Sequence, residues 1–240
     1  MDVPMEMQNQ VMGYDRAATM FSPDGHLLQV EYAEKTVRLG SASIGIVCKD
    51  GVVIISDKRT RDKLIVTESA NKVFEVDEHI IASAAGILSD ARILVERAQL
   101  IAQQHKVTYD SGIAVESVIK ELSDLKQAFT QYGGARPFGV SIMVAGISNS
   151  HPRLFVSDVT GNYFEYKASA IGENDEKIKE MLREEYKEIE LEEAIKLGFK
   201  IFKKILGKNF EIERFDVGII TIKEKKLKRL SEGELRKYAK

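Results

Sequence analysis

The first regular pattern of apolar and polar residues has the period of an α-helix and precedes every predicted strand. Ser22 is a suitable N-cap, Pro23 at the first helical position sacrifices no hydrogen bond, and Asp24 complements the positive end of the helix dipole. Gly40 offers a C-terminal stop. The pattern therefore predicts an amphipathic helix, whose apolar stripe must be buried on its own domain or against another subunit. The stripe consists of Leu27, Val30, Ala33 and Val37, with Leu28 and Tyr32 beside them.

After this helix the pattern changes to short runs rich in β-branched residues, with turn residues between them. Asp50-Gly51 joins the first two runs and is the pair most typical of a tight hairpin turn, and Thr160-Gly161 separates two later runs. Hairpin connections of this kind imply antiparallel sheets. The predicted strands cover residues 41–49, 52–58, 64–67, 72–76, 79–85, 138–147, 153–159, 162–171 and 216–222.

Two pairs of helices are predicted between and after these strands. In the first pair, one helix opens at Ser89 and Asp90, and the second carries an apolar stripe over residues 115–129. In the second pair, Asn174 is a candidate cap for one helix, and residues 191–205 form the other. Two helix pairs can cover the two outer faces of a pair of sheets. The sequence therefore predicts an α+β fold, a four-layer αββα sandwich with an extra N-terminal helix.

Composition excludes several classes of partner. The 35 basic residues nearly balance the 37 acidic ones, so no global field attracts nucleic acid or a membrane surface. No apolar stretch approaches the ~18 residues of a spanning helix, and residues 1–10 lack the basic region and apolar run of a signal peptide. The single cysteine, Cys48, cannot form an intramolecular disulfide. We expect a cytoplasmic protein with a mobile tail at residues 1–13 and one domain at residues 14–240.

The sequence offers little for a metal, cofactor or nucleic-acid site. His26, His79, His105 and His151 are scattered and lack the paired spacing of metal ligands. The chain has no glycine-rich loop of the phosphate-binding type. Residues 223–229 are strongly basic but contain no aromatic residue for stacking on bases, so we interpret them as a solvated charged segment. We therefore expect no metal, no cofactor and no nucleic-acid partner.

Three linked motifs in the amino-terminal block identify a family. Tyr14-Asp15-Arg16, Phe21-Ser22-Pro23-Asp24-Gly25 and Gln29-Val30-Glu31-Tyr32-Ala33 closely resemble, in register, the amino-terminal signature of proteasome α subunits. The resemblance implies a fold like that of amino-terminal-nucleophile hydrolases and a homo-heptameric ring that stacks on rings of proteolytic β subunits. It also implies that the ring templates assembly, admits unfolded substrates and binds the C-terminal tails of an activating AAA-type ATPase. The function would be gating and docking rather than bond cleavage.

The resemblance assigns a gate to this amino-terminal block. Tyr14, Asp15, Pro23 and Tyr32 match residues that hold the amino-terminal tails of the family in their open arrangement, and Arg16 belongs to the same motif. Several copies of residues 1–13 near a ring axis would plug an opening or withdraw from it. His26 stands where the family usually has Arg or Lys, which removes a constant positive charge from that position.

The resemblance also implies a pocket for an activator's tail. Lys72 matches a lysine that lies between neighbouring α subunits and pairs with the tail's terminal carboxylate. Gly86 and Ile87 complete this pocket, with isoleucine where the family often has leucine, and Gly25 and Glu31 are similar to residues that receive the tail's tyrosine. Without the resemblance, Lys72 would be interpreted as a solvated lysine at a strand end.

Two alternatives remain open at this point. Proteasome β subunits cleave peptides with an amino-terminal threonine, an aspartate and a lysine, and alignment on the first hairpin places Ser41, Asp57 and Lys72 near these positions. Ser41 follows forty residues and so lacks the free α-amine that serves as base. Self-cleavage after Gly40 would supply it and make the chain a self-processing hydrolase. The other alternative is a homo-oligomeric binding scaffold unconnected with proteolysis.

Overall fold

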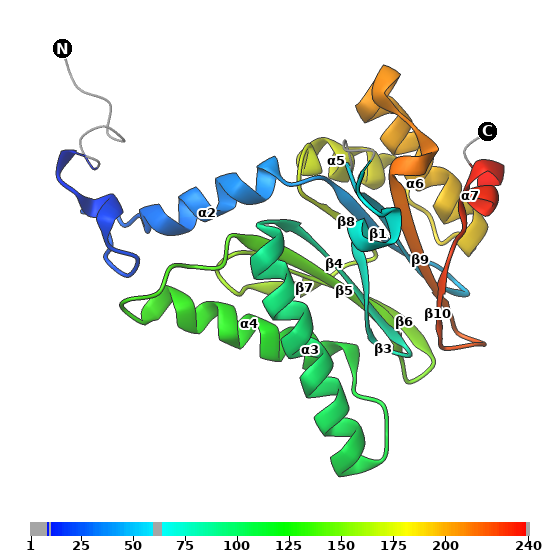
Figure 1. Ribbon diagram of the computed structural model, residues 1–240, viewed down its shortest axis with the longest axis horizontal. Coiled ribbons are helices and arrows are strands. Elements are labelled where there is room, and N and C mark those ends of the chain that lie inside the picture. Colours follow the sequence, from blue (N-terminus) through cyan, green and yellow to red (C-terminus); the bar gives the residue numbers. More distant parts are fainter. Residues whose placement is uncertain (1–8, 10, 60–63, 239–240) are drawn as a thin grey trace.

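The computed structural model describes residue 9, residues 11–59 and residues 64–238 (Figure 1). Within this part, ten strands form two five-stranded antiparallel sheets, in the orders β10-β9-β2-β1-β8 and β3-β4-β5-β6-β7. The predicted α+β sandwich is confirmed. The strands are β1 (Ser43–Val47), β2 (Gly51–Asp57), β3 (Val73–Asp77), β4 (Ile80–Gly86), β5 (Val140–Ser148), β6 (His151–Ser157), β7 (Tyr163–Glu165), β8 (Ala168–Ile171), β9 (Phe215–Thr221) and β10 (Leu227–Arg229).

Helix pairs cover the outer faces of both sheets (Figure 1). The helices α3 (Leu88–Tyr109) and α4 (Val115–Gln131) pack on the second sheet, while α5 (Asp175–Glu185) and α6 (Leu191–Leu206) pack on the first. This gives the four layers that the sequence predicts. The remaining helical elements are α2 (Leu28–Leu39), α7 (Glu232–Tyr238) and the 3-10 helices η1 (Tyr14–Arg16), η2 (Thr67–Ala70), η3 (Gly207–Asn209) and η4 (Ile212–Arg214).

Three hydrophobic cores separate these layers, and the alternation of side chains along β1 shows why. Ile44 and Ile46 face the core under α5 and α6, whereas Gly45 between them faces the other sheet. A Cβ atom at Gly45 would lie 2.5 Å from the sulfur of Met143, so this glycine permits the close approach of the two sheets. The core between the sheets also receives the apolar stripe of α2, namely Val30, Ala33 and Val37.

The amino-terminal helix begins later than the sequence predicts. Its first residue is Leu28, and residues 22–25 form a turn in which the amide of Gly25 donates to the carbonyl oxygen of Ser22 at 2.9 Å. The Oγ of Ser22 accepts from the amide of His26 at 3.2 Å, so it caps this turn and not the helix. Ser-Pro-Asp-Gly is the residue pattern of a turn, with Pro at its second and Gly at its fourth position. The predicted apolar stripe itself is confirmed, because Leu28, Val30, Ala33 and Val37 of α2 are all buried.

Two strand predictions were wrong, and one strand, β10, lies in a segment that we predicted to be a solvated charged segment. No strand covers residues 64–67, where the chain leads into the 3-10 helix η2. Residues 162–171 form two short strands in different sheets, β7 and β8, because the chain crosses from one sheet to the other between them. The basic segment 223–229 ends in β10, where Leu227 packs against the core between the sheets.

The predicted amino-terminal tail lies largely outside the described residues, which include only residue 9 and residues 11–13 of it. No helix within the described part of the chain is both long enough and apolar enough to span a bilayer.

Candidate functional site

Lys72 and Ser41 form the centre of the candidate site. Lys72 directly precedes β3, and its Nζ donates to the carbonyl oxygen and to the Oγ of Ser41, each at 2.8 Å. Only 4% of Lys72 is exposed. Burial lowers its pKa to about 8, although the carboxylates of Asp57 and Asp216 act in the opposite direction. The structure therefore places Lys72, a residue of the predicted activator pocket, next to Ser41, the serine of the self-processing-hydrolase hypothesis.

Asp216 fixes the backbone that carries Lys72. Its Oδ2 accepts from the amides of Lys72 and Val73, both at 2.8 Å. Its Oδ1 pairs with Arg229, whose guanidinium also donates to the carbonyl oxygen of Val73 at 2.7 Å. The sequence places Asp216 at the start of a strand and Arg229 in a charged segment, so local patterns gave no signal for this contact.

Asp57, the aspartate of the alternative hypothesis, is held by another side chain. Arg214 binds it with both ends of its guanidinium, Nη2 to Oδ2 at 2.6 Å and Nε to Oδ1 at 3.0 Å. Oδ1 also accepts from the amide of Arg59 at 2.9 Å. Both carboxylate oxygens of Asp57 are thus engaged by Arg214 and the amide of Arg59, and the nitrogen of Ser41 belongs to its peptide bond with Gly40 in the uncut chain.

Gly86 and Ile87 lie next to Ser41 at the carboxyl end of α2. Gly40 packs so closely against Gly86 that a Cβ atom at Gly40 would lie 2.3 Å from the nitrogen of Gly86. The amide of Ile87 donates to the carbonyl oxygen of Gly139 at 2.9 Å. Lys72, Ser41, Gly86 and Ile87 therefore form one continuous cluster, which we call the lysine cluster.

Gly25 and Glu31 lie at the opposite end of α2. Gly25 adopts a positive φ of 82° in the turn before the helix, and Glu31 occupies the first helical turn, where its Oε1 lies 2.5 Å from the Nδ1 of His26. A helix rises about 1.5 Å per residue, so Glu31 and Gly40 are about 13 Å apart along its axis. The structure does not bring Gly25 and Glu31 together with the lysine cluster within one chain.

The residues predicted to form the gate belong to a small unit packed on the start of α2. Tyr14, Asp15 and Arg16 form η1, which contacts α2, and the Nε2 of Gln29 donates to the carbonyl oxygen of Asp15 at 2.5 Å. The Oδ1 of Asp15 is buried and has no hydrogen-bond partner among the residues that the structure describes. Pro23 is exposed, and Tyr32 is half-buried with the ammonium of Lys35 5.4 Å from its ring centroid.

A bidentate ion pair connects the start of α3 with the loop before β5. Arg136 donates to both oxygens of Asp90 at 2.7 Å, and the amide of Gly139 donates to the same carboxylate at 2.9 Å. The hydrogen bond from Arg136 holds the pKa of Asp90 below its ordinary value. This pair fixes Gly139, which in turn accepts from the amide of Ile87 in the lysine cluster.

Lys126 is a buried titratable group that sequence reasoning missed. It lies on α4 with no exposed surface, and its Nζ donates to the carbonyl oxygen and the Oγ of Ser157, both at 3.3 Å. Burial lowers its pKa to about 7, with a smaller opposing effect from Asp158. In the sequence, Lys126 directly follows Leu125 of the predicted apolar stripe. This position beside the stripe is the only sign of its burial that the sequence offers.

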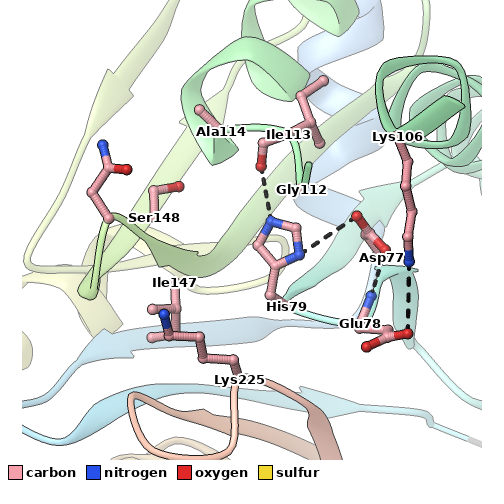
Figure 2. A pocket seen from close by; sticks show the side chains of 11 residues that line it. Asp77, Glu78, His79, Lys106, Gly112, Ile113, Ala114, Ile147, Ser148 and Lys225 are labelled. Carbon is pink, nitrogen blue, oxygen red and sulfur yellow. Dashed lines mark hydrogen bonds and ion pairs between the residues drawn. The ribbon is translucent and has the colours of Figure 1, made fainter. Parts of the chain in front are cut away.

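A polar pocket of about 370 Å³ lies where four loops meet at one end of the sandwich (Figure 2). His79 contacts two of these loops: its Nε2 lies 2.8 Å from the carbonyl oxygen of Ile113, and its Nδ1 lies 3.5 Å from Asp77. A Cβ atom at Gly112 would lie 2.7 Å from the imidazole ring, so this glycine admits the ring. The histidine therefore ties the β3–β4 turn to the loop before α4. No group of three or more His, Cys, Asp or Glu side chains within the described residues is arranged to hold a metal.

Comparison with known families and proteins gives consistent matches. The family model for proteasome subunits matches residues 37–220, and the model for the amino-terminal signature of proteasome A-type subunits matches residues 14–35. The chain is 46% identical over 226 residues to the proteasome subunit alpha of Thermococcus sibiricus, with 94% of this chain and 86% of the relative covered. It is 43% identical over 228 residues to the proteasome subunit alpha of Methanosarcina thermophila, with 95% and 92% covered.

Proposed function

The chain belongs to the proteasome α-subunit family, and we propose that it is a non-catalytic subunit of a 20S-type core particle. Copies of it form the outer heptameric ring, template the rings of proteolytic β subunits and control the entry of unfolded proteins. In this proposal the particle is cytoplasmic, residues 14–240 form one domain, and residues 1–13 form the tail that closes the gate.

One observation carries the non-catalytic role. The apolar stripe of α2, with Val30, Ala33 and Val37, is part of the core between the two sheets. Cleavage between Gly40 and Ser41 would separate this helix from the chain and leave that core open to water. Burial of a valine side chain such as Val30 or Val37 contributes about 1.5–3 kcal/mol. Maturation by cleavage before Ser41 would therefore cost the fold part of its interior, which favours a chain that stays intact.

The docking of activator tails is proposed to occur between neighbouring copies. Lys72, Gly86 and Ile87 lie at one end of α2, and Gly25 and Glu31 lie at the other, about 13 Å away along the helix axis. A single tail can contact both sets when the lysine cluster of one copy faces the helix start of the next. The ammonium of Lys72 would bind the terminal carboxylate, and Glu31 with Gly25 would receive the tail's tyrosine. Tail binding to the open arrangement would shift the ring toward it.

The Oδ1 of Asp15, which is buried and accepts from no group within the described residues, supports the gate assignment. A buried acceptor without a partner costs about 1–3 kcal/mol, so its position favours a state in which a donor reaches it. In the proposed open gate, that donor comes from the tyrosines of the same cluster, Tyr14 or Tyr32, of an adjacent copy. Pro23 stiffens the turn that carries this cluster.

Native mass spectrometry of the purified chain, followed by denaturation in the same instrument, tests the proposal. We expect a seven-fold or fourteen-fold assembly made of full-length chains. Subunits cut after Gly40 would instead establish the self-processing hydrolase that uses Ser41. A full-length monomer at all concentrations would contradict the ring.

A further inference from the structure

An ion pair between Arg59 and Glu173 lies beside the lysine cluster. The Nη2 of Arg59 contacts the Oε2 of Glu173, and 30% and 45% of their side chains are exposed. Only 4% of Lys72 is exposed, so this pair is the solvent-facing neighbour of a buried cation. Neither Arg59 nor Glu173 belongs to the pocket that the sequence predicts.

Backbone contacts attach Glu173 to the serine of the lysine cluster. The amide of Glu173 donates to the carbonyl oxygen of Gly40 at 2.8 Å. The preceding residue, Gly172, has a positive φ of 95°, and a Cβ atom there would lie 2.7 Å from the carbonyl oxygen of Ser41. Lys72 donates to that same oxygen. Glu173 and Lys72 are therefore anchored on one short stretch of backbone.

Arg59 is fixed by its own backbone and lies near the same ammonium. Its amide donates to the Oδ1 of Asp57 at 2.9 Å, and its φ of 47° is uncommon for a residue other than glycine. Burial is the main reason why the pKa of Lys72 is lowered to about 8, and the nearby charge of Arg59 acts in the same direction. Among the described residues, Glu173 pairs with Arg59, whereas no carboxylate pairs with Lys72.

This arrangement suits a further carboxylate. Ser41 accepts from two of the three N–H donors of Lys72, and the third has no acceptor among the residues that the structure describes. The guanidinium of Arg59 offers a fork of donors that can bind a carboxylate through two parallel hydrogen bonds. A carboxylate in contact with both cations would also relieve their mutual repulsion. Glu173 fills this role at Arg59 alone, and an exposed ion pair is weak.

We propose that Arg59 is a second carboxylate-binding residue of the tail pocket, and that Glu173 is an internal competitor that the tail's terminal carboxylate displaces. The inference rests on the proposed function, because it adds a binding residue and a competing group to the proposed docking site. Without a tail, Glu173 neutralises Arg59. When a tail docks, its carboxylate bridges Lys72 and Arg59, and Glu173 is released to solvent. An exposed ion pair is worth at most about fivefold in an equilibrium constant, so it can be displaced.

Binding of a tail peptide to assembled rings tests the inference. The probe is a short fluorescein-labelled peptide with a tyrosine near its free C-terminal carboxylate, and fluorescence anisotropy gives its affinity. Glu173→Gln should raise the affinity about twofold to fivefold, the range that corresponds to an exposed ion pair. Arg59→Gln should lower it about fivefold or more, because a charge-assisted contact is lost.

Matched controls remove one charge near the cluster without touching the ion pair. Glu176→Gln replaces an acidic side chain that is 71% exposed and three residues from Glu173, and Lys58→Gln replaces the basic residue before Arg59. Both controls should change the affinity less than twofold. All variants should form the same assembly as the unmodified chain by native mass spectrometry.

A double variant separates competition from a general charge effect. In Arg59→Gln rings, Glu173→Gln should no longer raise the affinity, because the competitor acts through Arg59. A rise of the same size there would show that Glu173 acts by charge alone and would overturn the competition. The same peptide with a C-terminal amide should respond to neither change.

The outcomes distinguish this inference from the proposed function. A peptide that loses affinity for Lys72→Ala rings, but binds Arg59→Gln and Glu173→Gln rings like unmodified ones, would overturn the inference and leave docking intact. Unmodified rings that do not bind the peptide would contradict the docking function, and the inference with it.

Discussion

The ammonium nitrogen of Lys72 lies 2.8 Å from the hydroxyl oxygen of Ser41 and 2.8 Å from its carbonyl oxygen. A lysine has three N–H donors, so Ser41 engages two of them and one remains for another acceptor. Lys72 is thus held in position by Ser41, the residue that would be the nucleophile under the hydrolase hypothesis. In the uncut chain this geometry orients a cation at the carboxyl end of α2.

Replacement of Lys72 should prevent activator docking. We expect Lys72→Ala to abolish the ATPase-stimulated hydrolysis of peptides by the assembled particle, because the tail's carboxylate loses its charged partner. Basal hydrolysis without activator should be unchanged. Stimulated and basal rates are compared with those of Ser41→Ala, which keeps the ammonium and should retain partial stimulation. Full stimulation of Lys72→Ala would disprove the pocket assignment.

Lys126 should make stability depend on pH. Its pKa is about 7 in the folded chain against an ordinary value of 10.5, so the unfolded chain binds the extra proton between these values. Stability therefore rises with pH across this window and is lowest below pH 7, where the charged amine is buried. We expect Lys126→Met to be more stable than the unmodified chain by a few kcal/mol near pH 6, since each pKa unit corresponds to about 1.4 kcal/mol.

The gain of Lys126→Met should shrink as the pH rises from 7 toward 10.5, because the lysine is neutral in both the folded and the unfolded state only above 10.5. Urea unfolding of both chains at pH 6, 8 and 10 and equal chain concentration measures the difference. Lys120→Met on the exposed face of the same helix is the control and should leave the slope with pH unchanged. Identical pH slopes for Lys126→Met and the unmodified chain would rule out a buried, titrating Lys126.

The pair of Asp90 and Arg136 should stabilise the loop before β5. Among the described residues, Arg136→Ala leaves the Asp90 carboxylate with the amide of Gly139 alone as a partner. We expect a loss of about 1–2 kcal/mol, which is modest because the guanidinium is partly solvated. The pKa of Asp90 is depressed in the folded chain, so this contribution is present above its ordinary value of 3.8 and is lost as the pH falls below it. Unfolding at pH 7 and pH 3 should show a gap between variant and unmodified chain at pH 7 that is smaller at pH 3. A gap of the same size at both pH values would contradict the ion-pair origin.

Removal of residues 1–13 should open the proposed gate. In particles assembled with β subunits, we expect the truncated chain to raise the basal hydrolysis of peptides severalfold, since nothing then blocks the axial opening. The β-subunit activity toward a substrate small enough to pass a closed gate serves as control and should not change. An unchanged basal rate for the longer peptides would refute the plug.

Much of the fold is predictable because it depends on local periodicity. The stripe of α2 and the hairpin at Asp50-Gly51 were both confirmed. Periodicity does not predict the structure of a segment when its sequence pattern is compatible with two different local structures. The Ser22–Gly25 sequence suits both a helix start and a turn, and only the structure shows that the helix begins at Leu28. Residues 162–171 read as one strand because alternation does not reveal to which sheet a strand belongs.

The candidate site is less predictable because its contacts join distant parts of the chain. Family resemblance singled out Lys72 and Ser41, but the pairing of Asp57 with Arg214 spans 157 residues and leaves no trace in local sequence. The burial of Lys126 is equally nonlocal, since it depends on Ser157 in a strand that packs against α4. Such contacts can be inferred only once the topology is known.

The order of strands in the first sheet has a consequence for synthesis on the ribosome. That sheet combines β1 and β2 with β8, β9 and β10, while all five strands of the second sheet lie between them in the sequence. The β1–β2 hairpin leaves the exit tunnel early, yet β2 pairs with β9, which is made last but one. Until then the hairpin carries an apolar edge that invites association with other chains. A chain interrupted before residue 215 keeps that edge open, so translation must finish before this subunit can be safely released to assemble.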